Sequence, residues 1–193
     1  IWKIISFMNL IIFGPPGAGK GTQADFIVNK FNLFKLSTGE VLRNEIDNKT
    51  QLGKEISSII NSGSLVSDNI VEKLVETFIA DKKYKDRLIF DGYPRNLTQA
   101  KTLGKLLEKH KQKIDLVLKL SVSLETIKKR ILERSTIEKR ADDNKEIAVK
   151  RYRTYEKSTE PVIEYYKKLN LLKVIDGERA IDQINKEISN IIT

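Results

Sequence analysis

Residues Gly14-Pro15-Pro16-Gly17-Ala18-Gly19-Lys20-Gly21-Thr22 decide the fold of this 193-residue chain. An apolar run, Leu10 to Phe13, precedes them, and a helix-like segment begins near Lys20. A strand, a glycine-rich turn and a helix N-terminus together form a phosphate cradle, because glycines let backbone N–H groups point inward and a lysine neutralises phosphate oxygens. The spacing fits G-x-x-x-x-G-K, but Gly21 follows the lysine and the hydroxyl comes one place later, at Thr22. We therefore expect a phosphate-binding loop.

Outward from this loop, short apolar runs alternate with helical patterns. This alternation predicts an α/β fold with a parallel five-stranded sheet that helices cover on both faces. The expected strands are 9–13, 34–36, 87–90, 116–120 and 172–175. The expected helices are 23–30, 38–47, 51–61, 69–80, 97–109, 124–133, 145–169 and 181–191. The length fits a single domain over residues 1–193, and we interpret 1–7 as an extension upstream of Met8.

Several local signals place helix ends and breaks. Ser37-Thr38-Gly39-Glu40 has capping-box spacing, and Ser67 with Asp68 is expected to cap the helix that follows. The polar stretch 135–144 reads as a loop, with Asp142 or Asp143 capping the long helix after it. Pro161 is expected to break or kink that long helix.

The composition is that of a soluble globular protein, with 40% hydrophobic and 32% charged residues. Since there are no cysteines, disulfides and thiolate metal sites are excluded, and a single histidine, His110, leaves little for zinc. The 35 basic and 26 acidic residues give a net charge of +9, which suits polyanionic ligands. Lysine is abundant along the whole chain, however, so we interpret the total as a compositional bias and assign function only to particular arginines. The apolar N-terminal run is too short for a membrane helix, and we expect a cytoplasmic protein with no membrane partner.

Polar residues follow three of the expected strands. The cradle follows the first strand, Ser37-Thr38 the second and Asp91 the third. In open parallel sheets, ligands bind at the carboxyl ends of the strands. We therefore expect one site that these three segments share.

Three stretches, Gly14 to Gln23, Leu36 to Arg43 and Asp91 to Gln99, carry a family resemblance, and Arg130 to Arg151 agrees with them. From Asn9 to its C-terminus the chain resembles adenylate kinases, which are nucleoside monophosphate kinases of the P-loop class. The resemblance implies reversible phosphoryl transfer, in which MgATP and AMP give two ADP. It also implies a mobile AMP-binding segment at 37–66 and a short lid at 134–144 that lacks the zinc-binding cysteines of some relatives.

The resemblance assigns residues to each substrate. ATP would be held by Gly17, Ala18, Gly19, Lys20, Gly21, Thr22, Arg130, Arg134 and Arg179, with Arg130 stacked on the adenine and Arg134 at the phosphates. AMP would be held by Thr38, Arg43, Ser64, Leu65, Val66, Gly92, Tyr93, Pro94, Arg95, Gln99, Arg140 and Arg151. The expected catalytic residues are Lys20, Asp91, Arg95, Arg134, Arg140 and Arg151. Mg²⁺ would be held through phosphates and waters near Asp91 and Thr22, with no direct protein ligand.

Two neighbouring interpretations stay open at this point. A uridylate/cytidylate kinase shares the cradle, the short lid and most of the arginines. Thr38 and Gln99 favour AMP over UMP and CMP. In pyrimidine kinases, alanine stands in place of this threonine, in the motif S-A-G, and asparagine stands in place of this glutamine. A glutamine amide matches the edge of adenine. A basic P-loop protein that binds RNA or a protein partner would need exposed aromatics among its basic residues, and the run 109–113 has none.

The sequence supports three further expectations. No N-K-x-D motif occurs, which disfavours a GTP switch. We expect a monomer without a nucleic-acid partner. Ser67 stands where the family commonly has proline, and we expect little consequence from the change.

Overall fold

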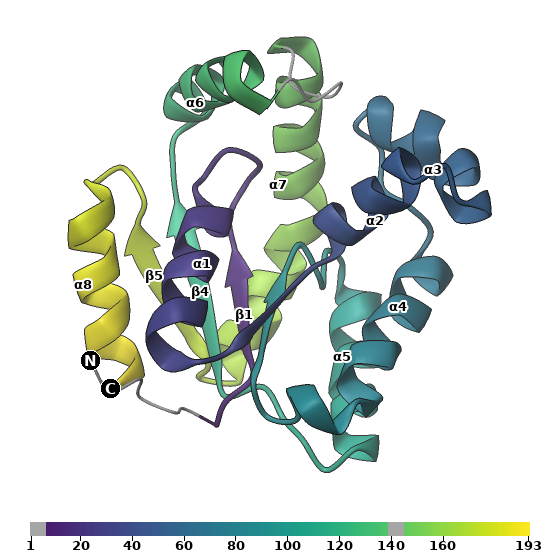
Figure 1. Cartoon of the computed structure of the whole chain (residues 1–193). Coiled ribbons are helices and arrows are strands. Elements are labelled where there is room, and N and C mark those ends of the chain that lie inside the picture. Colours follow the sequence, from purple (N-terminus) through teal and green to yellow (C-terminus); the bar gives the residue numbers. More distant parts are fainter. Residues whose placement is uncertain (1–6, 139–144) are drawn as a thin grey trace.

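The computed structural model describes residues 7–138 and 145–193 (Figure 1). Its described part contains one sheet of five parallel strands in the order β2-β3-β1-β4-β5, which confirms the predicted sheet. The strands are β1 (Leu10–Phe13), β2 (Phe34–Ser37), β3 (Leu88–Asp91), β4 (Leu116–Ser121) and β5 (Leu172–Asp176). The helices are α1 (Lys20–Phe31), α2 (Thr38–Asp47), α3 (Gln51–Asn61), α4 (Asp68–Ala80), α5 (Leu97–Lys109), α6 (Leu124–Glu138), α7 (Lys145–Lys168) and α8 (Ile181–Ile192), with a short 3₁₀ helix, η1, at Lys82–Tyr84.

Helices cover both faces of the sheet. Side chains alternate along a strand, so Ile11 and Phe13 join one core with residues of α4, α5 and α7. Leu10 and Ile12 join the opposite core with residues of α1, α6 and α8. All four side chains belong to β1. This strand is therefore buried on both faces, as expected for the centre of a parallel sheet.

Asn9 joins three segments at the amino end of the sheet. Its Oδ1 accepts the backbone N–H of Leu88 at 3.0 Å, and its Nδ2 donates to Gln112 Oε1 at 3.2 Å and to the Lys113 carbonyl at 3.1 Å. Its own N–H donates to Asp115 Oδ2 at 3.0 Å. Asn9 is fully buried, so each of these bonds satisfies a group that water cannot reach.

The predicted helix ends are partly confirmed. Helices at 51–61 and 97–109 have the expected bounds, and the Ser37 hydroxyl accepts the N–H of Glu40 at 3.4 Å as the capping box requires. The prediction that Ser67 caps α4 is wrong, since its side chain makes no capping hydrogen bond. Ser67 is exposed, so water can accept hydrogen bonds from the first-turn backbone amides in place of its hydroxyl.

Two further predictions need correction. The loop expected from Ser135 does not begin there, because α6 continues to Glu138: residues 134–138 contain neither glycine nor proline, and polarity alone does not end a helix. Pro161 does not break α7, which runs uninterrupted from Lys145 to Lys168. Burial of Thr159, Val162 and Ile163 beside the proline offsets the lost backbone hydrogen bond. The capping role of Asp142 or Asp143 falls outside the described residues.

Candidate functional site

The loop between β1 and α1 has the backbone of an anion cradle. Gly17 and Gly19 have φ of 85° and 92°, in the left-handed region that favours glycine, and the Ala18 N–H donates to the Pro15 carbonyl at 3.0 Å. A Cβ on Gly17 would also lie 3.0 Å from Ile131 Cγ1. Gly19 precedes α1 without any side-chain cap, so the positive end of this helix is left for a ligand.

Lys20 lies inside the cradle and folds back onto it. Its Nζ donates to the carbonyl oxygens of Gly14 at 2.9 Å and Pro15 at 3.2 Å. Burial lowers the pKa of Lys20 to about 8, with Asp91 opposing that shift and Arg95, Arg151 and Arg134 adding to it. A polyanion bound in the cradle would stabilise the charged form of Lys20.

A cavity beside the cradle gathers further cations. Arg43 of α2, Arg95 after β3, Arg151 of α7 and Lys20 all line it. Burial and the charges of Arg151 and Arg43, opposed by Asp91, together lower the pKa of Arg95 to about 10. Positive groups from four separate segments therefore converge on one space, which favours a ligand with a concentrated negative charge.

The turn after β3 explains why glycine follows Asp91. Gly92 has φ of 81°, and a Cβ there would lie 3.1 Å from both Thr38 Oγ1 and an Arg95 guanidinium nitrogen. The Gly92 carbonyl accepts hydrogen bonds from Thr38 Oγ1 at 3.1 Å and from Arg95 Nε at 2.6 Å. The start of α2 and the arginine are thereby fixed to the same atom.

Gln99 lines the cavity and is held by groups on both sides. Its Oε1 accepts the backbone N–H of Arg95 at 2.7 Å, and its Nε2 donates to Asp68 Oδ1 at 2.7 Å. Tyr93, which was expected to line the site, is only 1% exposed, and its hydroxyl donates to the Gln99 carbonyl at 3.3 Å. The structure thus places Tyr93 in the core behind the glutamine.

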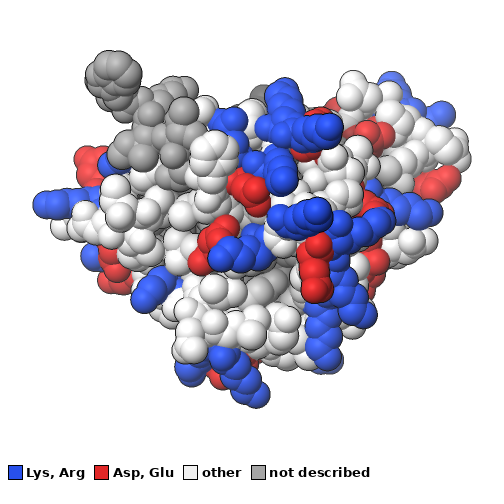
Figure 2. All heavy atoms as spheres, turned by 90° about the horizontal axis from the view of Figure 1, so that it is seen from below, with Lys and Arg blue, Asp and Glu red and all other residues white. Residues whose placement is uncertain are grey.

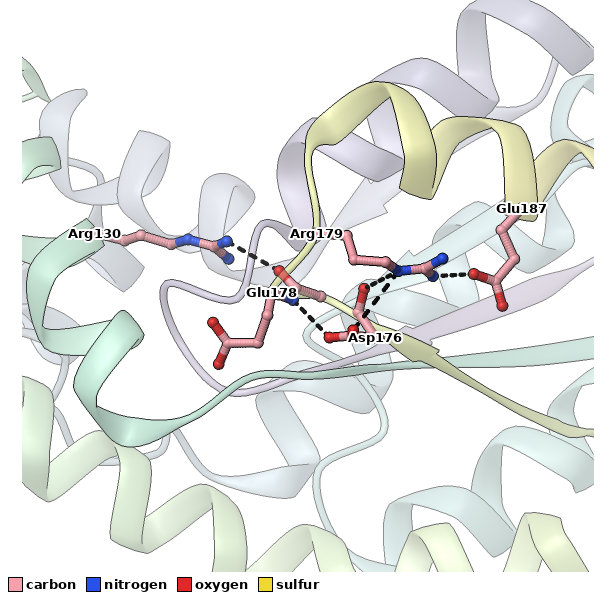
Figure 3. Close-up of polar contacts among 6 residues, drawn as sticks. Arg130, Asp176, Glu178, Arg179 and Glu187 are labelled. Atoms are coloured by element: carbon pink, nitrogen blue, oxygen red, sulfur yellow. Dashed lines mark hydrogen bonds and ion pairs between the residues drawn. The ribbon is translucent and has the colours of Figure 1, made fainter.

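On the other side of the cradle, α6 is tied to the turn between β5 and α8 (Figure 3). Arg130 donates to the Gly177 carbonyl at 2.9 Å and to the Ala18 carbonyl at 3.3 Å. Glu178 accepts the Ser123 N–H and the Thr126 hydroxyl, both at 2.6 Å, at the start of α6. Arg130 therefore joins the phosphate cradle to this turn.

Arg179 lies in the same turn and links it to α8. It forms ion pairs with Asp176 and Glu187, and Figure 3 shows it between these two acids. Its hydrogen bond to Glu187 raises its pKa.

The structure brings most of the expected acceptor-side residues to one cavity. Those that line it are Thr38, Arg43, Ser64, Leu65, Val66, Gly92, Pro94, Arg95, Gln99 and Arg151. Asp91 and Arg134 both act electrostatically on Lys20, which lines this space, so both lie near it. Arg140 falls outside the described residues, as does most of the stretch 134–144, whose role as a short lid stays a prediction.

Sequence reasoning missed one wall of the cavity. Thr154, Tyr155, Ser158 and Thr159 follow Arg151 on α7 and line the same space. Their offsets of three, four, seven and eight residues are those of one helix face, so the position of Arg151 carried the signal for them.

Charge elsewhere on the molecule is mixed. The face seen from below in Figure 2, opposite the carboxyl ends of the strands, shows lysines and arginines standing among acidic groups. Lys109 pairs with Glu76, and Lys113 with Asp115. This face supports the interpretation of the net charge as a compositional bias.

The described part of the chain holds neither a cluster of metal ligands nor a helix that could span a membrane. Among residues 7–138 and 145–193, no three histidine or acidic side chains lie together as metal ligands. Within that same part of the chain, every helix is too short or too polar to cross a bilayer.

The chain is similar to known proteins over nearly its whole length. Residues 12–171 match the family model described as adenylate kinase. The chain is 46% identical over 211 residues to a protein named adenylate kinase from Pelagibacter ubique, covering 96% of this chain and 99% of that protein. It is 40% identical over 207 residues to one from Fusobacterium nucleatum (96% and 98% covered) and 43% identical over 180 residues to one from Prochlorococcus marinus (93% and 96% covered).

Proposed function

The chain belongs to the adenylate kinase family, and from that premise we propose how its residues divide between the two substrates and the transfer step. The single observation that carries the proposal is the convergence of Lys20, Arg43, Arg95 and Arg151 on one cavity that Gln99 also lines. A nucleoside monophosphate offers the matching pair of groups, a dianionic phosphate and a base. The proposal therefore places AMP in this cavity.

AMP binds with its phosphate at the arginines and its base toward Gln99. Arg43 and Arg95 hold the phosphate, since planar guanidinium groups can bind two of its oxygens at once. The apolar wall formed by Leu65, Val66 and neighbouring side chains packs against the base. Arg140 and Arg151 complete the phosphate site in the proposal.

MgATP is the donor and binds at the cradle. The amides of residues 17–22 and Lys20 hold its phosphates, while Arg130 and Arg179 lie near its base and Arg134 near the transferred group. A carboxylate at Asp91 and a hydroxyl at Thr22 offer the oxygen chemistry that Mg²⁺ accepts. Since the described residues hold no cluster of metal ligands, they fit an ion that arrives with the nucleotide and keeps most of its waters.

In the transfer step, an oxygen of the AMP phosphate forms a bond to the terminal phosphorus of ATP. The bond from that phosphorus to the bridging oxygen breaks, and ADP leaves from each side. Lys20, Arg95, Arg134 and Arg151 stabilise the charge on the transferred group, which requires positioning and electrostatics and no covalent intermediate. Repulsion among these cations in the empty site favours an open arrangement, and the phosphates offset it.

A coupled assay of ADP formation from ATP and AMP tests the proposal. We expect turnover that requires both nucleotides and Mg²⁺, with AMP preferred over UMP, CMP and GMP. Comparable kcat/KM for AMP and a pyrimidine nucleotide would contradict the assignment of the acceptor. We also propose that the protein acts as a cytoplasmic monomer; sedimentation at assay concentration checks the oligomeric state.

A further inference from the structure

Asp68, just after the AMP-binding segment, contacts the residue that is proposed to face the base. It is the first residue of α4, which lies beside α5 (Figure 1). Both of its carboxylate oxygens accept hydrogen bonds from Asn96 Nδ2, at 3.1 Å each, and Oδ1 also accepts from Gln99 Nε2 at 2.7 Å. In its contacts with the start of α5, Asp68 therefore acts only as a hydrogen-bond acceptor.

The orientation of Asn96 is itself fixed. Asn96 is the N-cap of α5, and its Oδ1 accepts the backbone N–H of Gln99 at 2.8 Å. Because a backbone N–H can only donate, the oxygen of Asn96 must face it and the Nδ2 must face Asp68. The capping bond therefore holds the carboxylate in place.

The same reasoning fixes the side-chain amide of Gln99. A carboxylate only accepts, so it selects Nε2, and the backbone N–H of Arg95 only donates, so it selects Oε1 at 2.7 Å. If the amide turned over, Oε1 would face a carboxylate oxygen with no proton between them, and Nε2 would face another donor. Gln99 is 2% exposed, so water cannot relieve either clash.

A fixed amide offers a fixed order of groups to a bound base. Oε1 and Nε2 each keep one further hydrogen-bonding site, and Gln99 lines the cavity. Oε1 suits an exocyclic amino group and Nε2 suits an unprotonated ring nitrogen, which is the order on adenine. Hypoxanthine carries a carbonyl and a ring N–H in the same two places, so it would meet acceptor with acceptor and donor with donor.

We propose that Asp68 is a positioning residue that locks the Gln99 amide in the orientation that accepts 6-amino purines and rejects 6-oxo purines. This inference rests on the proposed function, since it needs AMP in the cavity. It extends to pyrimidines: cytosine has the order of adenine and uracil that of hypoxanthine. CMP is therefore a better acceptor than UMP, although the two bases have the same size.

The test compares AMP with IMP, and CMP with UMP, as acceptors for wild type and for Asp68→Asn, with ATP as donor. An asparagine can donate to the Gln99 oxygen, which removes the stronger of the two contacts that oppose the turned-over amide and leaves only the Arg95 N–H against it. We expect the ratio of kcat/KM for AMP over IMP to fall about tenfold or more, and the ratio for CMP over UMP to fall as well. A purely structural role would lower all four values together and leave both ratios unchanged.

Controls separate the inference from the proposed function. Glu72→Gln makes the same acid-to-amide change one turn along α4 and is expected to keep the wild-type ratios. Gln99→Leu removes the amide and should collapse the AMP over IMP ratio even if Asp68→Asn does not fold. A wild type that does not phosphorylate AMP refutes the proposed function. If the wild type is active, unchanged ratios in Gln99→Leu refute both the proposed position of the base and this inference, and unchanged ratios in a folded Asp68→Asn overturn this inference alone.

Discussion

Replacing Lys20 with methionine is expected to abolish most activity while making the nucleotide-free protein more stable. Methionine keeps the length and apolar stem of the side chain but removes its charge. Lys20 is the cation inside the phosphate cradle, and losing a preorganised group that meets developing charge costs about 3–4 kcal/mol, or several hundredfold in rate. The opposite effect on stability follows from what surrounds this lysine when no phosphate is bound.

The magnitude of the stability gain comes from the pKa of Lys20. Burial, with Arg95, Arg151 and Arg134 adding to it, lowers this pKa from 10.5 to about 8. One pKa unit corresponds to about 1.4 kcal/mol, so the charged form costs roughly 3 kcal/mol as an upper bound. Solvent at this partly exposed group and the lost hydrogen bonds to Gly14 and Pro15 reduce the net gain to about 1–2 kcal/mol, or a Tm increase of about 2–8 °C.

The pH dependence gives a second signature of the same charge. The folded pKa lies below the unfolded value, so between about pH 8 and 10.5 the unfolded chain binds a proton that the folded chain does not. The contribution of Lys20 therefore penalises folding fully below pH 8, and this penalty is lost as the pH rises through that window. Lys20→Met should lack this rise in stability.

The assays are ADP formation and thermal unfolding of the nucleotide-free protein at pH 7 and pH 9.5. Lys101→Met, an exposed lysine on α5, is the matched control and should change neither rate nor Tm appreciably. A folded Lys20→Met protein with near wild-type turnover would refute the assignment of the cradle. A Tm lower than that of wild type at pH 7 would refute the argument about its electrostatics.

Three other perturbations follow from the same contacts. The kcat/KM for ATP should fall above about pH 8, because Lys20 of the nucleotide-free enzyme loses its proton there. A flat profile to pH 10 would contradict the lowered pKa. Arg130→Ala should raise the KM for ATP about tenfold with less effect on the KM for AMP, because it releases the Gly177 carbonyl from α6; equal changes for both nucleotides would argue against a donor-side role. Asn9→Ala should lower the free energy of unfolding by about 2–3 kcal/mol, since the buried Leu88 N–H loses its acceptor, and urea unfolding measures this; a change under 0.5 kcal/mol would show that another group satisfies it.

Much of the fold could be predicted because its signals are local. Each strand is a short apolar run, and the capping spacing of Ser37 and Glu40 lies within four residues. Errors arose where a local signal competed with tertiary packing. Pro161 was expected to break or kink α7, and the helix is not broken, because the buried side chains beside the proline hold it together. Ser67 stands at the predicted N-cap position of α4, but its exposed side chain makes no capping bond, since water can accept from the first-turn amides in its place.

The site divides in the same way. The sequence by itself determined the cradle, since glycines at 17 and 19 and the lysine after them impose its backbone within a few residues. Only the tertiary structure decided which groups meet: Asp68 and Gln99 are 31 residues apart, and Arg130 and Ala18 are 112 apart. No local pattern encodes such pairs, because the sheet order and the packing of its helices determine them. The sequence therefore predicted Gln99 as a base-facing residue, while only the fold brought Asp68 to its amide.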